Sequence, residues 1–137
     1  MKLILHTDGG ARGNPGPAGI GVVIADDKGK VIKLIKEYVG EGTNNQAEYK
    51  ALLKGLKEAS AMNAEEVICN MDSELVVKQL TGLYKIKEPG LQVLASEVLS
   101  LTGKFKQIKF HHVRREKNVE ADKLVNEVLD ENASRKA

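Results

Sequence analysis

The sequence contains one cysteine, Cys69, among its 137 residues. A single thiol cannot form an internal disulfide, and such sparing use of cysteine is typical of proteins from reducing compartments. Cys69 lies in the apolar run EEVICNMD, where an unpaired cysteine usually packs as a small apolar side chain. We therefore predict a buried and chemically inert thiol.

Long apolar runs are also missing. No stretch approaches the roughly 20 residues that a membrane-spanning helix needs, and the N-terminus lacks the pattern of a signal peptide. The sequence thus predicts a soluble cytoplasmic protein that does not bind a membrane.

The chain lacks a large excess of either charge. It has 21 lysines and arginines against 19 aspartates and glutamates, which gives a formal net charge of +2. This charge is too small to indicate nucleic-acid binding by itself, so any such function must be argued from particular residues. The apolar and charged fractions are near the average for one globular domain.

The spacing of apolar residues predicts one mixed α/β domain. The expected strands are residues 1–8, 20–26, 30–40, 65–72 and 104–113, and the expected helices are residues 43–63, 73–82, 89–103 and 118–132. The order β-β-β-α-β-α-α-β-α implies one mixed sheet covered by helices, in which the first three strands form an antiparallel meander. Thr43 and Asn44 are the N-cap candidates of the first helix. The domain is expected to span residues 1–131, with residues 132–137 as a flexible C-terminal tail.

An acidic residue ends two of the expected strands. Asp8 precedes a stretch rich in glycine and proline, residues 9–19, which is expected to be a loop, and Asp72 directly precedes a helix. Ligands collect at the carboxyl ends of strands in open α/β sheets. The two carboxylates therefore converge if their strands are parallel neighbours. Alternatively, Asp8 is bonded only to the backbone of its own turn.

Two further carboxylates lie on helix faces that are expected to meet the core. Glu48 shares a stripe with Leu52 and Gly55, and Asp122 shares a face with Val125. Alternatively, Glu48 only stabilises the positive end of its helix, an effect of about 0.3–1 kcal/mol, and Asp122 is solvated.

Carboxylates clustered at one place would repel one another. Two unit charges 4 Å apart repel by about 4 kcal/mol at an effective dielectric constant near 20, so such a cluster becomes protonated or holds cations. Mg²⁺ prefers oxygen ligands, and paired divalent ions about 3.5–4 Å apart are typical of phosphoryl-transfer sites. The sequence predicts such a site if the four carboxylates converge.

Four motifs occur in an order that resembles type 1 ribonuclease H. They are TDGGARGNPGPAG, TNNQAEYKAL, NMDSELVVKQLTG and NVEADKLVNE, and the resemblance covers nearly the whole chain. It implies a ribonuclease H-like fold, with a five-stranded mixed sheet flanked by helices, antiparallel in its first three strands and then parallel. It also implies a sequence-nonspecific endoribonuclease that hydrolyses the RNA strand of RNA/DNA hybrids and leaves 5′-phosphate and 3′-hydroxyl ends.

The resemblance further implies the residues of the site. The four carboxylates would be catalytic and would hold two Mg²⁺ or Mn²⁺ ions: Asp8, Glu48, Asp72 and Asp122. The residues expected to bind the nucleic acid are Gly10, Ala11, Arg12, Asn14, Thr43, Asn44 and Asn45. Most of these would read the minor groove through its shape and its 2′-hydroxyls. Thr43 would instead seat a phosphate of the DNA strand. Helix capping is the alternative for Asn44 and Asn45, and solvation is the alternative for Arg12.

Two features depart from the better-known bacterial members. Their basic protrusion, rich in lysine and tryptophan, is replaced by TGLYKIKEPGLQ, and the chain has no tryptophan. Lys85 and Lys87 are candidates for holding the DNA strand, with simple solvation as the alternative. The loop histidine of many relatives is also missing, because His111 and His112 belong to a predicted strand.

Arg115 and Asn118 are the auxiliary candidates near that missing histidine. Arg115 would orient a phosphate or aid product release, or it is only a surface charge. The departures resemble a compact archaeal and bacterial branch that acts as a monomer without an N-terminal hybrid-binding module. Double-stranded RNA stays open as a second substrate, because some members of that branch cut it.

Three other classes of protein compete with this interpretation. An integrase or transposase core shares the architecture but typically uses three carboxylates. A non-catalytic module that binds RNA/DNA hybrids is the main alternative, although such modules lose carboxylates that are present here. A structural domain attached to a polymerase is the third.

Overall fold

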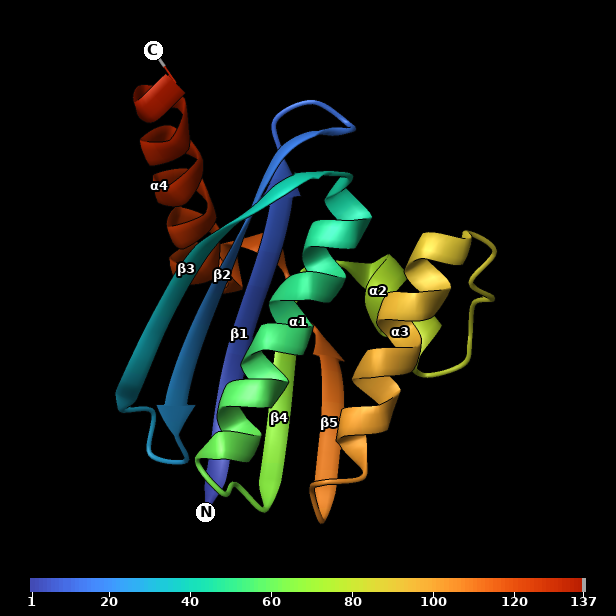
Figure 1. Ribbon diagram of the computed structural model, residues 1–137. Helices are drawn as coiled ribbons and strands as arrows, with labels where there is room; N and C mark the ends of the chain where they lie inside the picture. The colour runs from blue at the N-terminus through green and yellow to red at the C-terminus, as the bar shows by residue number, and fades with distance from the viewer. Residues whose placement is uncertain (137) are drawn as a thin grey trace.

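In the computed structural model, which describes residues 1–136, a five-stranded sheet separates two layers of helices (Figure 1). The strands are β1 (Lys2–Ala11), β2 (Gly16–Asp26), β3 (Val31–Gly42), β4 (Glu66–Met71) and β5 (Gln107–His112). The helices are α1 (Asn44–Ala61), α2 (Glu74–Leu80), α3 (Pro89–Thr102), the short 3₁₀ helix η1 (Arg115–Lys117) and α4 (Val119–Lys136). No helix in this part of the chain is long and apolar enough to cross a bilayer.

The sheet has the strand order β3-β2-β1-β4-β5. The first three strands pair antiparallel, and β1 pairs parallel with β4, which in turn pairs parallel with β5. The fold class predicted from the sequence is therefore confirmed. A parallel pair needs a long crossover connection, which α1 provides between the meander and β4.

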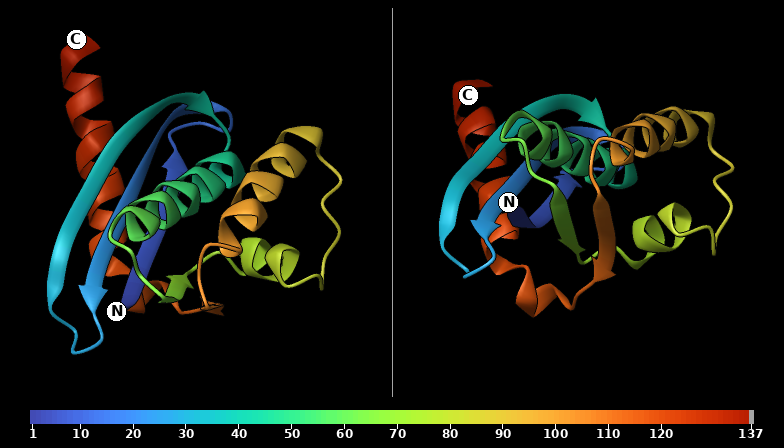
Figure 2. Two further views of the ribbon diagram at one scale, coloured as in Figure 1. Left: turned by 60° about the horizontal axis from the view of Figure 1, so that its bottom comes forward. Right: turned by 90° about the horizontal axis from the view of Figure 1, so that it is seen from below.

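The helices bury apolar side chains on both faces of the sheet. Helices α1 and α3 lie over one face and α4 lies over the other, as the two views of Figure 2 show. The larger core fills the side of α1 and α3, and Leu3, Leu5, Val22, Leu52 and Leu56 are fully buried there. Cys69 belongs to this core, and burial raises the pKa of its thiol. A smaller apolar cluster joins α4 to the other face.

Helix α1 begins with a capping box. The Thr43 hydroxyl accepts a hydrogen bond from the Gln46 amide at 3.1 Å, and the Gln46 side chain accepts one from the Thr43 amide at 2.9 Å. The two bonds satisfy amides that the first helical turn leaves without partners. Of the two predicted N-cap candidates, Thr43 takes this position and Asn44 becomes the first helical residue.

The glycine-rich stretch is not the long loop that its composition predicts. Strand β1 continues through Ala11 and β2 begins at Gly16, so Asp8 lies within β1, opposite Gly21. The glycines are required by packing. A Cβ on Gly9 would lie 2.3 Å from the Ala47 backbone, and one on Gly21 would lie 2.3 Å from the carbonyl oxygen of Ala121. Helices α1 and α4 thus pack directly against the strand backbone at these glycines, one on each face of the sheet.

The last helix is longer than the sequence predicts. It was expected over residues 118–132, but α4 continues to Lys136. The segment from Asn132 to Lys136 contains neither glycine nor proline, so nothing in it breaks a helix. Ala137 lies outside the described residues. The domain limits and the mobility of this last helical turn stay predictions.

Replacing Gly21 by alanine should destabilise the fold by about 3 kcal/mol, because α4 would have to move away from β2. Denaturant unfolding followed by circular dichroism would measure the change. Gly103→Ala is the matched control: the nearest atom to its Cβ would lie 3.9 Å away, so its stability should stay near that of the wild type. Equal stability of the two variants would contradict the close packing of α4 on Gly21.

Candidate active site

Two parallel strands place the first pair of carboxylates side by side. Thr7 of β1 is paired with Met71 of β4, and each of these residues directly precedes an aspartate, Asp8 or Asp72. The condition set by the sequence, that the two strands be parallel neighbours, is therefore met. Helix α1 adds Glu48, and the first turn of α4 adds Asp122.

The four side chains meet at one end of the sheet. Carboxylate oxygens of Asp8, Glu48 and Asp72 lie within 4.8 Å of one another. Asp122 lines the same cleft and contributes to the raised pKa of Asp8. The structure thus brings together all four predicted carboxylates, although three come from β1, α1 and α4 and Asp72 comes from the residue after β4.

Glu48 is held in place by the backbone of β1. The Gly9 amide donates a hydrogen bond to Glu48 Oε1 at 2.5 Å. This contact needs the close approach of α1 that the missing Gly9 side chain allows. The glycine that follows Asp8 therefore has a direct part in forming the carboxylate cluster.

The cluster has strongly shifted protonation. Burial, followed by the nearby charge of Glu48, raises the pKa of Asp8 to about 10. Burial also raises the pKa of Glu48 to about 7, even though hydrogen bonds from Asp8 and from the Gly9 amide favour its charged form. At neutral pH the protein by itself therefore keeps Asp8 protonated.

One cation lies next to the cluster. Arg115 Nε is 3.7 Å from Asp72 Oδ2, and the Arg115 side chain is 83% exposed. Among the described residues, no other lysine or arginine pairs with any of the four carboxylates within 4.0 Å. One exposed arginine cannot balance four carboxylates, so the site has the charge and the oxygen-only donors that suit divalent ions such as Mg²⁺.

The carboxylates lie in a cleft of about 490 Å³. Five of the residues expected to bind nucleic acid line it with them: Gly10, Ala11, Arg12, Asn44 and Asn45. Asn14 and Thr43 lie beside it, Asn14 bonded to the Asn44 amide and Thr43 as the N-cap of α1. Ser73 and Asn126 also line the cleft and were not singled out from the sequence. Asn126 could have been found from its position four residues after Asp122 in the same helix. Its side-chain amide donates a hydrogen bond to the Asp122 carbonyl at 3.1 Å.

Hydrogen bonds fasten the β1–β2 hairpin to α1. Asn44 Oδ1 accepts from the Ala11 amide at 2.8 Å, and Asn14 Oδ1 accepts from the Asn44 amide at 3.1 Å. On the other side, the Arg12 guanidinium lies 2.6 Å from the Asp130 carboxylate of α4. The hairpin is thus held between the two helices that carry Glu48 and Asp122.

Asn118 links two of the elements that carry carboxylates. Its side chain is buried, and Nδ2 donates to the Thr7 carbonyl at 2.9 Å, next to Asp8. Its own carbonyl accepts from the Asp122 amide at 3.1 Å. Asn118 therefore fixes the start of α4 against β1, and through them the relative positions of Asp8 and Asp122.

Asn118→Ala should lower the free energy of unfolding by about 1–3 kcal/mol, because the buried Thr7 carbonyl would lose its donor. It should also weaken the binding of divalent ions by displacing Asp122. Urea unfolding and titration calorimetry with Mn²⁺ would measure the two effects. Asn132→Ala in the same helix is the control, since that side chain has no hydrogen bond within the described residues. Unchanged stability of Asn118→Ala would argue against the proposed link.

Comparison with known proteins gives a consistent result. A family model described as reverse transcriptase-like matches residues 6–128. The bifunctional protein Rv2228c of Mycobacterium tuberculosis is 42% identical over 131 residues, which cover 95% of this chain and 36% of that protein. Ribonuclease HI of Halobacterium salinarum is 39% identical over 130 residues, which cover 95% of this chain and 65% of that protein. The chain thus spans about a third to two thirds of the length of these curated relatives.

Two solved structures match nearly the full chain. RNase H1 from Halobacterium salinarum superposes with a TM-score of 0.94 at 37% identity, and the match covers 96% of this chain and 99% of that one. LC11-RNase H1, solved in complex with an RNA/DNA hybrid, superposes with a TM-score of 0.91 at 46% identity over the same shares.

Proposed function

This chain belongs to the ribonuclease H family, and we propose that it is a metal-dependent endoribonuclease that hydrolyses the RNA strand of RNA/DNA hybrids. The observation that carries the proposal is the cluster of carboxylate oxygens from Asp8, Glu48 and Asp72, within 4.8 Å of one another at one end of the sheet. Its shifted protonation supports a site built for cations rather than for stability.

The four carboxylates would hold two Mg²⁺ or Mn²⁺ ions. The residues that would hold them are Asp8, Glu48, Asp72 and Asp122, which line one cleft. When bound, the ions would supply a water of lowered pKa and would stabilise the charge on the leaving 3′-oxygen. Such a reaction leaves a 5′-phosphate and a 3′-hydroxyl.

The protein's own groups would position the substrate. Asn14 and Asn44 use their side-chain oxygens within the protein, so each has its amide nitrogen left to donate to the nucleic acid. Donors on the hairpin and at the start of α1 suit a minor groove that exposes 2′-hydroxyls, without base specificity. Arg115, exposed beside Asp72, is placed to orient a phosphate or to aid product release.

The test follows cleavage of an end-labelled RNA annealed to DNA, with Mg²⁺, with Mn²⁺ or with chelator. We expect internal cuts that require a divalent ion, at many sequences, with 3′-hydroxyl ends on the labelled fragments. The same RNA annealed to RNA decides whether double-stranded RNA is a second substrate. Tight binding of the hybrid with no cleavage under any ion would overturn the enzyme and favour a non-catalytic hybrid-binding module.

A further inference from the structure

Positive charge is concentrated in one short part of the chain. Residues 104–117 contain six lysines and arginines and one glutamate, whereas the rest of the chain has 15 basic and 18 acidic residues. The six form what we call the basic strip: Lys104, Lys106, Lys109, Arg114, Arg115 and Lys117. A net charge of +2 for the whole chain conceals this asymmetry.

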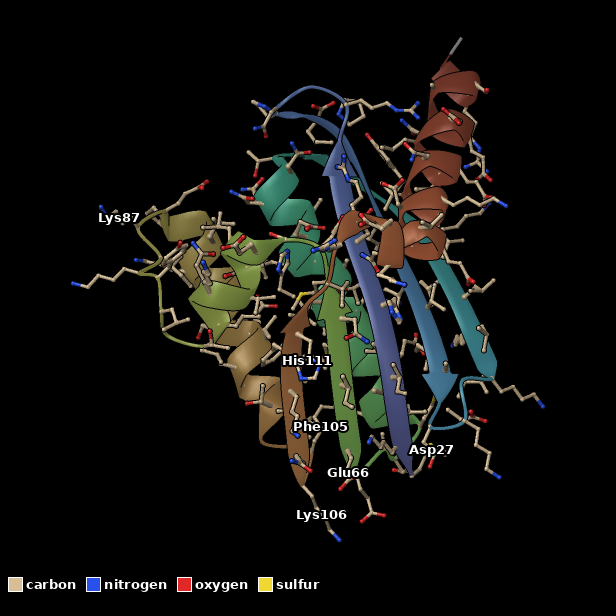
Figure 3. The ribbon with its side chains drawn as sticks, turned by 180° about the vertical axis from the view of Figure 1, so that it is seen from behind. Asp27, Glu66, Lys87, Phe105, Lys106 and His111 are labelled. Carbon is tan, nitrogen blue, oxygen red and sulfur yellow. The ribbon has the colours of Figure 1, made fainter. Side chains whose placement is uncertain are left out.

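The basic strip follows the edge of the sheet up to the cleft. Strand β5 is an edge strand paired with β4, and η1 follows it, with Arg115 beside Asp72. Ile108 and Phe110 pack against the larger core, so Lys109 and His111 face away from it. Figure 3 shows this back face, with His111 on β5 and Lys106 just before the strand, while α4 lies over the opposite half of the sheet.

Four of these six charges have no carboxylate partner in the part of the chain that the structure describes. Lys106 pairs with Glu65 at 2.8 Å, and Arg115 pairs with Asp72. The other four, Lys104, Lys109, Arg114 and Lys117, are exposed and have no carboxylate within 4.0 Å among the described residues. Unpaired cations in a line attract a polyanion.

We propose that the basic strip binds an unpaired nucleic-acid strand that continues from the duplex held in the cleft. This inference rests on the proposed function. Lys109 lies on β5 itself, Lys104 and Lys106 precede the strand, and the other three cations follow it. The strand is about 20 Å long, so the strip is a single row along one sheet edge. Such a row suits one extended strand better than the two backbones of a duplex. His111 adds an imidazole on which a base can stack.

Lysines on an edge strand have another use, because they oppose pairing with the strands of other molecules. That role needs no ligand. The two roles can be distinguished by experiment. If these lysines bind a nucleic acid, replacing them changes how the affinity for that nucleic acid depends on salt, whereas a role against strand pairing predicts no such change.

The test measures binding by the Asp8→Asn variant, which should leave the RNA intact, in Mg²⁺ at several salt concentrations. A blunt hybrid is compared with hybrids that carry a short unpaired extension at each strand end in turn. We expect at least one extension to tighten binding and to steepen the slope of log K against log salt by about 2. Three phosphate contacts give this change, because each contact with a single strand adds about 0.7 to the slope. The factor by which the extension tightens binding should then be about 20 times smaller at 200 mM salt than at 50 mM.

A triple change in the Asp8→Asn background should remove the extra slope and leave binding of the blunt hybrid unchanged. It combines Lys104→Gln, Lys109→Gln and Lys117→Gln. The matched control adds Lys28→Gln and Lys30→Gln, exposed lysines of the β2–β3 hairpin that have no ion pair among the described residues. The control should keep the gain from the extension.

No gain from any extension, or a gain that survives the triple change, would overturn the inference while the blunt hybrid is still bound and is cleaved by the wild type. A wild type that neither binds nor cleaves the blunt hybrid would instead overturn the proposed function, and the inference with it.

Discussion

Asp8→Asn should reduce the rate of hybrid cleavage at least about 10³-fold, which corresponds to about 4 kcal/mol of transition-state stabilisation. Asp8 is at the centre of the cluster, since its pKa responds to Glu48, Asp72 and Asp122 together. An amide in its place keeps the shape of the side chain but removes the charge that would hold the ions. Single-turnover cleavage of a labelled hybrid in Mg²⁺ would measure the loss.

Two comparisons make this result specific. Asp27→Asn, in the exposed hairpin between β2 and β3, should leave the rate unchanged. Glu48→Gln keeps an oxygen that can accept from the Gly9 amide but loses its charge, so a large loss there would show that charge matters more than this hydrogen bond. Activity of Asp8→Asn within tenfold of the wild type would rule out the central role of Asp8.

The same Asp8→Asn change should stabilise the metal-free protein at pH 8 by up to about 6 kcal/mol, because pH 8 is about four units above the ordinary pKa of an aspartate. The pKa of Asp8 is raised in the folded state, from 3.8 to about 10. Folding therefore favours the protonated form, and this contribution is complete below about pH 4 and is lost as the pH rises toward 10. Each unit of pKa difference corresponds to about 1.4 kcal/mol. Asparagine cannot ionise, so it avoids the loss.

Urea unfolding in chelator between pH 4 and pH 9 would measure this effect. The stability difference between Asp8→Asn and the wild type should be small near pH 4 and should grow with pH. The pKa of Glu48 is raised to about 7, so the wild type also loses stability through this residue as the pH rises toward 7. Millimolar Mg²⁺ should stabilise the wild type more than the variant, because only the wild type keeps all four carboxylates. A variant less stable than the wild type at pH 8 in chelator would contradict the raised pKa.

Together the two predictions describe one residue that supplies activity at the expense of stability. Such a trade-off is typical of active sites and is unusual for residues that support the fold. A structural aspartate would give the opposite result on stability, because its removal would break a favourable contact.

Much of the fold could be predicted from local patterns. Apolar periodicity gave the order of strands and helices, and Thr43 followed by Gln46 marks the start of α1 with a capping box. Asp8 and Asp72 could be paired because two parallel strands present their carboxyl ends at the same edge of a sheet. These signals act over a few residues, or follow general rules of sheet topology.

The tertiary structure alone decided the rest. Glycines of residues 9–19 favour a loop when only neighbours in sequence are considered, yet they lie in β1 and β2 because α1 and α4 pack against their bare backbone. The link from Asn118 to Thr7 spans 111 residues of sequence. The pKa of Asp8 depends on burial, on the charges of Glu48 in α1 and of Asp72 after β4, and on Asp122 of α4. The sequence by itself predicted the four carboxylates as the site residues and the strands and helices in or beside which they lie. Their mutual distances, their burial and hence their pKa values depend on contacts between segments far apart in the chain, and only folding creates those contacts.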